Sequence, residues 1–169
     1  MRPRIVEGDT AGTGLRIGIV ASRFNKAVVE GLLQGTLEEL EEAGVAESDV
    51  IVVWVPGALE LPLTVNRLAR QREVDGLIAL GCVIRGETAH FEHVGREAVA
   101  GLSRVSLESG IPVATGVLTV EDMEQARIRS GLDPDPTGGK EWRERHRGRE
   151  AARACLEMIN LLRRIENEG

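Results

Sequence analysis

The sequence has 169 residues, 42% of them hydrophobic, which is enough for one domain with a buried core, and no linker to a second domain is visible. Only 2% of the residues are aromatic, so the core must consist of Val, Leu, Ile and Ala, as in parallel sheets covered by helices. The net charge of −6 disfavours general binding to nucleic acids or membrane surfaces, and an anionic ligand would need a local basic site.

Short apolar runs alternate with longer amphipathic stretches along nearly the whole chain. The composition of the runs predicts strands at 15–22, 49–57, 74–86 and 111–119. Helical spacing of apolar residues predicts helices at 26–45, 58–74, 90–110, 121–131 and 140–166. Pro62 fits the second of these helices only in its first turn. Strict alternation of strand and helix predicts a parallel sheet with right-handed crossovers, a three-layer α/β sandwich.

Ligands of such sheets bind outside the carboxyl ends of the strands. Every candidate side chain follows a predicted strand, and one rim therefore gathers Phe24, Asn25, Glu60, Arg85, Thr88 and His90. Phe24 is an aromatic residue directly after a strand in a chain with few aromatic residues, which suggests stacking on a flat ring, with a core position as the alternative. Arg85 ends a strand, where an arginine often pairs with a nearby carboxylate, and we interpret it as structural.

The segment "RGETAH" (85–90) has the features of an anion site. Gly86 permits a tight turn, and the amides of Glu87 and Thr88 precede a helix whose dipole favours negative charge. The Thr88 hydroxyl either donates to the anion or caps the helix. His90 carries an imidazole, the group most often used for proton transfer in enzymes, with a plain surface histidine as the alternative. A metal pair with His93 is disfavoured because no third ligand has suitable spacing.

Other features of the sequence favour structural interpretations. Cys82 and Cys155 lie far apart in unlike settings, which indicates two buried thiols and neither a disulfide nor a metal site. The basic stretch at 143–149 is interleaved with glutamates at salt-bridge spacing, which predicts a solvated helix face and no nucleic-acid site. No signal-peptide-like segment and no run of about eighteen apolar residues is present, so we expect a cytoplasmic protein without a membrane partner.

Four ordered motifs, "ASRFN", "VPGALELP", "ALGCVIRGETAHFEHV" and "GVLTVEDMEQARIRSG", together resemble the lumazine synthase family. The resemblance runs from about residue 15 to 131 and resumes in the last helix. It implies a flavodoxin-like fold with strand order 2-1-3-4 in a single domain over 15–169, preceded by a segment 1–14 that pairs with a neighbouring subunit. It also implies condensation of 5-amino-6-ribitylaminouracil with 3,4-dihydroxy-2-butanone 4-phosphate, the penultimate step of riboflavin synthesis, with no cofactor and no metal.

The resemblance assigns roles to residues of this chain. Phe24 would stack on the pyrimidine, and the rest of that substrate would be held by Ala58, Leu59, Glu60, Cys82, Val83 and Ile84. Glu87 and Thr88 would bind phosphate, and His90 would move protons. From an adjoining subunit, Thr115 would line the pyrimidine pocket and Arg129 would clamp the phosphate, and Lys140 is aligned with the lysine of the family's following loop.

The family assembles as pentamers or as icosahedral shells of pentamers. The stretch "GLDPDPTGGKEW" is longer than the corresponding loop of shell-forming members, which favours a free pentamer here. A partnership with riboflavin synthase is left open. Two other functions are weighed: an archaeal-type riboflavin synthase, which would need no phosphate clamp, and a non-catalytic flavin-binding or shell-forming relative, which would need neither His90 nor Arg129. A generic flavodoxin is disfavoured because "ASRFNK" lacks a Ser/Thr-rich phosphate loop.

Overall fold

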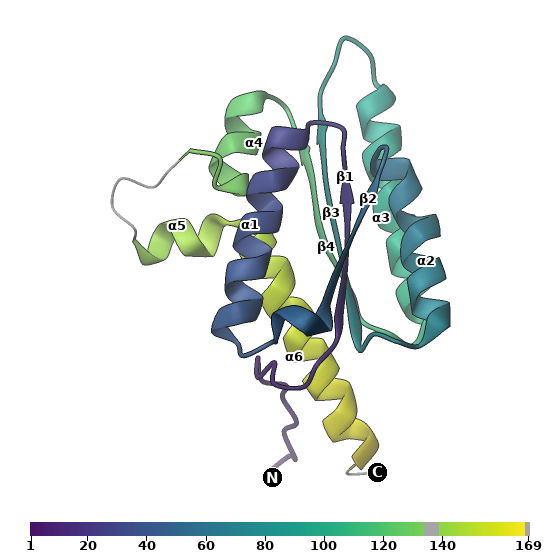
Figure 1. The fold of residues 1–169 in the computed structure, drawn as a ribbon, viewed down its shortest axis with the longest axis vertical. Helices are drawn as coiled ribbons and strands as arrows, with labels where there is room; N and C mark the ends of the chain where they lie inside the picture. Colours follow the sequence, from purple (N-terminus) through teal and green to yellow (C-terminus); the bar gives the residue numbers. More distant parts are fainter. Residues whose placement is uncertain (134–138, 168–169) are drawn as a thin grey trace.

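A computed structural model of the chain describes residues 1–133 and 139–167, with four parallel strands in one sheet (Figure 1). The strands are β1 (Ile17–Ser22), β2 (Val50–Val55), β3 (Gly76–Ile84) and β4 (Val113–Val120). Their order, β2-β1-β3-β4, confirms the order that the family resemblance implied. In the centre of the sheet, Val20 of β1 is paired with Val53 of β2 and with Ala79 of β3. All candidate residues that follow strands therefore emerge at one edge.

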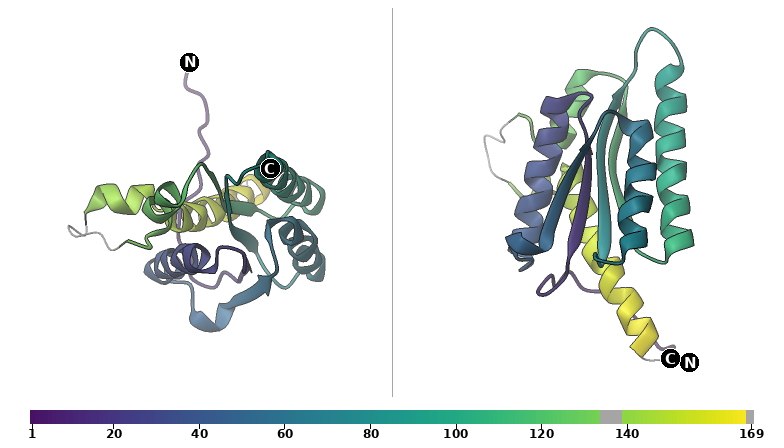
Figure 2. Two further views of the ribbon diagram at one scale, coloured as in Figure 1. Left: turned by 90° about the horizontal axis from the view of Figure 1, so that it is seen from above. Right: turned by 45° about the vertical axis from the view of Figure 1, so that its right-hand side comes forward.

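Helices cover both faces of the sheet and make the predicted three layers (Figure 2). One face carries α1 (Lys26–Glu42), α4 (Met123–Ser130) and α6 (Arg147–Asn167). The other face carries α2 (Leu61–Gln71) and α3 (His90–Ser109). The central strands β1 and β3 are almost wholly buried between these layers, as their unbroken apolar sequences require.

An aliphatic core lies on each face of the sheet. On the α1 and α6 face, Ile19 and Leu80 pack with Leu32 and Leu156, all fully buried. On the α2 and α3 face the corresponding cluster includes Val20, Ala79, Leu61 and Leu102. Each fully buried Leu or Ile contributes about 1.5–3 kcal/mol through the hydrophobic effect. Aliphatic residues thus form most of the core, with Phe91 buried in the second cluster and Trp54 packed against the first.

Local signals explain where the helices begin and end. Pro62 lies in the first turn of α2, as predicted, after a short 3-10 turn at Ala58–Glu60. The Asp122 carboxylate accepts a hydrogen bond from the Gln125 amide at 2.8 Å and caps α4. Helix α3 ends at Gly110, whose φ of 73° lies in the left-handed region.

The prediction of one long helix over 140–166 is wrong, because the helix is interrupted at His146. The structure has a short helix α5 (Lys140–Arg145) and then α6, with His146 in an extended conformation (φ −77°, ψ 107°) between them. The side chain of His146 turns into the interior and is 2% exposed. Helical periodicity continues across the break, so sequence spacing alone could not reveal it.

The prediction of a solvated face at 143–149 is also wrong in part. The expected salt links exist between Arg145 and Glu141 and between Arg147 and Glu150. Arg149, in contrast, is 2% exposed and points toward carboxylates of α1. The stretch therefore fastens α6 to α1 and does not form a free basic surface.

The segment before β1 lies along α6. The side-chain amide of Asn160 donates hydrogen bonds to the carbonyls of Asp9 and Ala11, both at 2.9 Å, and Arg164 pairs with Asp9. Ile5, nearer the N-terminus, is 75% exposed. No helix in the described ranges is long and apolar enough to cross a bilayer.

Candidate active site

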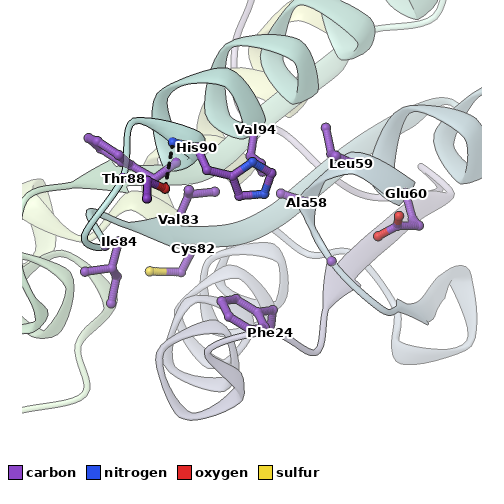
Figure 3. A pocket seen from close by; sticks show the side chains of 13 residues that line it. Phe24, Ala58, Leu59, Glu60, Cys82, Val83, Ile84, Thr88, His90 and Val94 are labelled. Atoms are coloured by element: carbon purple, nitrogen blue, oxygen red, sulfur yellow. Dashed lines mark hydrogen bonds between the residues drawn. The ribbon is translucent and has the colours of Figure 1, made fainter.

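A pocket of about 370 Å³ opens at the carboxyl edge of the sheet (Figure 3). It brings together nine of the residues that the sequence placed in the site, namely Phe24, Ala58, Leu59, Glu60, Cys82, Val83, Ile84, Thr88 and His90. Gly86, predicted to form the tight turn of the anion site, also lines it, as do Gly57, Phe91 and Val94, which were not predicted. The grouping follows from topology, because parallel strands deliver their following turns to the same edge.

The turn after β1 holds Phe24 at the pocket with its ring in solvent. The Arg23 and Phe24 amides donate to the carbonyls of Val55 and Pro56 at 2.8 and 3.1 Å, which ties this turn to the end of β2. Asn25 adopts a left-handed conformation (φ 55°), and its side chain donates to the Cys82 carbonyl at 3.0 Å. The Phe24 side chain is 69% exposed, which excludes a core position and leaves a flat apolar surface for a ligand.

The floor of the pocket is apolar and uncharged. Ala58, Cys82 and Val83 are buried there, at the ends of β2 and β3. Burial raises the pKa of the Cys82 thiol to about 11, so this thiol stays protonated at neutral pH. Cys155 is likewise buried, as predicted for both cysteines. The floor thus offers van der Waals contact and backbone hydrogen bonds to a flat ring, and no reactive thiolate.

The polar mouth of the pocket lies in the turn before α3. His90 is exposed at the first position of α3, and Figure 3 shows its imidazole pointing into the pocket. The Thr88 hydroxyl accepts a long hydrogen bond from the His90 amide at 3.4 Å, but the N-cap position of α3 is Ala89, so Thr88 does not occupy the cap itself. Glu87 is exposed and is not among the residues that line the pocket.

No lysine or arginine lines this pocket within the described ranges. Arg85 is close by, but its guanidinium forms salt bridges with Glu121 and Glu92 and lies 4.5 Å from the centre of the Phe91 ring. This confirms the structural interpretation of Arg85. A phosphate dianion at this mouth would find the helix-start amides but no free guanidinium from the same pocket.

The remaining predicted residues lie in a second pocket of about 350 Å³ along β4. Thr115 and Arg129 line it together with 116–120 and Arg147. The Arg129 guanidinium donates to the Gln125 carbonyl at 3.1 Å, and Arg147 pairs with Glu150. On a single chain, therefore, the structure does not bring Thr115 and Arg129 into the pocket of His90.

Sequence reasoning missed Arg147 as a second cation beside Arg129. Its signal was Gly148, a residue that is unfavourable inside a helix and would have suggested a helix start at this point. Lys140 begins α5, but its side chain lies outside the described part of the structure. Among the described residues, no three His, Cys, Asp or Glu side chains come together as a metal site.

Comparison with known proteins agrees with this geometry. A family model described as 6,7-dimethyl-8-ribityllumazine synthase matches residues 14–163. The chain is 49% identical over 158 residues to the 6,7-dimethyl-8-ribityllumazine synthase of Paraburkholderia phytofirmans, covering 94% of this chain and 86% of the relative. It is 46% identical over 160 residues to the protein of the same name from an Azoarcus species, covering 95% and 94%. The chain therefore belongs to the 6,7-dimethyl-8-ribityllumazine synthase family.

Proposed function

We propose that this chain condenses 5-amino-6-ribitylaminouracil with 3,4-dihydroxy-2-butanone 4-phosphate at sites shared between neighbouring subunits. The products are 6,7-dimethyl-8-ribityllumazine, inorganic phosphate and water. One observation carries the proposal: among the residues that the structure describes, no lysine or arginine lines the pocket with His90 and Phe24, and no histidine lines the pocket with Arg129 and Arg147. The pyrimidine and the phosphate ester need both kinds of surface, and two subunits in contact supply them.

The first pocket suits the pyrimidine substrate. The exposed Phe24 ring would stack on the pyrimidine, over the buried floor of Cys82 and Val83. Ala58, Leu59 and Glu60 begin the next helix at the pocket wall, where their amides and the Glu60 carboxylate would hold the ring edge and the ribityl chain. Ile84, at the end of β3, completes this wall, and Thr115 of the adjoining subunit would close the pocket from outside.

The second substrate would place its phosphate at the junction of the two pockets. The amides of Glu87 and Thr88 lie in the turn that precedes α3, where the helix dipole favours an anion. Arg129 and Arg147 of the neighbour would bring two guanidinium groups to the same phosphate, with bidentate hydrogen bonds that strengthen as it leaves.

The reaction requires several proton transfers at one place. The 5-amino group attacks the ketone and forms an imine with loss of water, and elimination then expels phosphate. The resulting enol tautomerises, and the ribitylamino nitrogen closes the second ring with loss of another water. His90, at the mouth beside the reacting carbons, would donate and accept these protons, which is worth about 10² to 10⁴ in rate. Holding the two substrates in register supplies much of the remainder.

The assembly proposed for this site is a pentamer. The exposed Ile5 and the polar hollow along edge strand β4 are surfaces that a neighbouring subunit would cover, in agreement with a role of segment 1–14 in subunit pairing. The choice of a pentamer over a shell depends on the extended loop after α4. A partnership with riboflavin synthase stays a prediction.

Mixed oligomers test the shared site directly. His90→Asn removes proton transfer from one half-site, and Arg129→Ala removes a cation from the other, so each variant alone should lose most of its activity. If the two are co-expressed in equal amounts, random assembly gives both intact halves to about a quarter of the sites, and activity should recover to about that fraction of wild type.

Lumazine absorbance and phosphate release measure the recovery, and light scattering confirms that the oligomers form. Co-expressed His90→Asn and His90→Ala serve as the matched control, because no site in that mixture regains an imidazole. Activity that fails to recover, in oligomers shown by native mass spectrometry to contain both variants, would place the whole site on one chain and refute the proposal.

A further inference from the structure

A buried histidine outside the proposed site connects the elements that carry its two arginines. His146 is 2% exposed and directly precedes Arg147, the first residue of α6. Its Nδ1 accepts hydrogen bonds from the amides of Gly148 and Arg149, at 3.1 and 3.4 Å. These are unpaired amides of the first turn of α6, so the imidazole acts as the helix cap. Because Nδ1 is an acceptor, it must be unprotonated, and the ring must be neutral.

Two glycines leave the space that this ring fills. A Cβ atom at Gly35 of α1 would lie 2.3 Å from Cε1 of His146, and one at Gly131, just after α4, would lie 2.7 Å from Cδ2. Trp142 of α5 packs edge-on against the imidazole, with ring centres 5.4 Å apart. His146 therefore contacts α1, the end of α4, α5 and the start of α6, and it touches Gly131 only two residues after Arg129.

The charges around His146 determine how it responds to pH. Burial lowers the pKa of His146, the nearby Arg149 guanidinium lowers it further, and the Glu38 carboxylate of α1 opposes both. The imidazole is thus neutral at neutral pH and gains a proton only below its ordinary range near pH 6.5. Protonation would remove both acceptor hydrogen bonds and place a second buried cation beside Arg149.

We propose that His146 is a positioning residue for the cationic half-site: its neutral ring holds Arg147 and the end of α4 with Arg129 in place, and acid releases them together. This inference rests on the proposed function, since it concerns the pocket that would bind the phosphate of the four-carbon substrate. Acid should weaken phosphate binding through this histidine, while the pyrimidine pocket, built on other strands, should retain its affinity.

The test compares wild type with His146→Asn and His146→Ala. Asparagine also caps helices but does not titrate, whereas alanine offers no acceptor. Between about pH 7.5 and the lowest pH at which both proteins stay folded and assembled, the KM of wild type for the butanone phosphate should rise about three- to tenfold more than that of His146→Asn, the effect expected from loss of one cap. The phosphate ester itself titrates with a pKa of about 6, and its effect cancels because both proteins meet the same substrate.

His146→Ala should show the raised KM for the phosphate substrate at every pH, and the KM for the pyrimidine should change less than about twofold in all three proteins. Thermal melting and light scattering establish that each variant is folded and assembled. If His146→Ala does not assemble, the comparison of wild type with His146→Asn still decides. An equal acid rise in wild type and His146→Asn, or an equal rise of both KM values, would overturn the inference.

Binding of inorganic phosphate, measured by calorimetry across the same pH range, examines the half-site without turnover. Phosphate affinity should fall with acid more steeply in wild type than in His146→Asn, and equal falls would overturn the inference. Absence of condensation by wild type at neutral pH would refute the proposed function, and the phosphate titration would still test His146 by itself. Failures of the two proposals are therefore distinguishable.

Discussion

Replacing Arg149 by methionine tests the ion-pair cluster that fastens α6 to α1. The Arg149 side chain is 3% exposed, and its Nη1 lies 3.0 Å from a Glu39 carboxylate oxygen and 3.3 Å from one of Glu42. Its Nη2 pairs with Glu38. Methionine retains much of the apolar stem, so the variant removes charge and hydrogen bonds with little change in packing.

The expected loss of stability depends on the ion-pair partners that each carboxylate retains in the variant. Removing one partner of a buried ion pair costs about 3–5 kcal/mol. Here Glu39 keeps Arg153 at 2.7 Å, Glu42 keeps Arg143 at 2.9 Å, and the Glu38 side chain is already 39% exposed and reaches water. We therefore expect Arg149→Met to lower the free energy of unfolding by about 2–4 kcal/mol. For a chain of this length, this lowers Tm by about 4–16 °C.

Thermal and urea denaturation at fixed protein concentration measure the difference, and pH supplies a second check. A hydrogen bond from Gln34, together with Arg149, lowers the pKa of Glu38. Burial raises the pKa of Glu39, but hydrogen bonds from Arg153 and Arg149 outweigh it, and the net shift is downward. Carboxylates with lowered pKa values stabilise the fold above their ordinary pKa near 4.5, and this contribution is lost as pH falls through the folded value.

Wild type and Arg149→Met should consequently converge in stability below about pH 4.5. Arg153→Met is the matched control: its side chain is 36% exposed with one carboxylate partner, and it should cost about 1 kcal/mol or less. The reasoning would be refuted if the free energy of unfolding of Arg149→Met were within about 1 kcal/mol of wild type at neutral pH. It would also be refuted if the difference between the two proteins persisted unchanged in acid.

Three further predictions concern single side chains. Phe24→Ala should raise the KM for the pyrimidine about tenfold, as expected for loss of a stacked ring. The free energy of unfolding should change by less than about 0.5 kcal/mol because the ring is exposed, and a large loss of stability would show that Phe24 is a core residue. Burial raises the pKa values of Cys82 and Cys155 to about 11 and about 12, so neither thiol should react with Ellman's reagent at pH 8 until the protein is unfolded, and rapid labelling of the native protein would contradict this. Gly35→Ala should destabilise the protein by about 1–3 kcal/mol, since its Cβ would overlap the His146 ring, and an unchanged Tm would show that the ring moves freely.

The elements that could be predicted from sequence are those whose cause is local or topological. Apolar runs predicted all four strands, and the rule that ligands bind at the carboxyl ends predicted that Phe24, Thr88 and His90 lie together, as they do in the first pocket. Pro62 was assigned to a first helical turn for a purely steric reason, and it lies there.

Most features that escaped prediction have tertiary causes, although Gly148 was a local signal for the helix start after His146. The break at His146 depends on space that Gly35 and Gly131 leave from two other elements, and helical spacing runs through it without interruption. Arg147 joins the second pocket only because of that break. The burial of Arg149 likewise requires the carboxylates of α1, which lie more than a hundred residues earlier in the chain. Pattern reasoning that treats each segment alone has no access to such contacts.

Within residues 1–133 and 139–167, no lysine or arginine side chain is seen to line the pocket of His90, and this determines how ionic strength affects the two substrates. An uncharged ring bound through contact and hydrogen bonds gains nothing from long-range attraction, so dissolved salt leaves its affinity unaltered. The guanidinium groups along β4 attract a dianion through solvent, and mobile counterions weaken that attraction within about 10 Å at 0.1 M salt. Added potassium chloride should therefore weaken binding of the phosphate ester and leave the affinity for the pyrimidine unchanged.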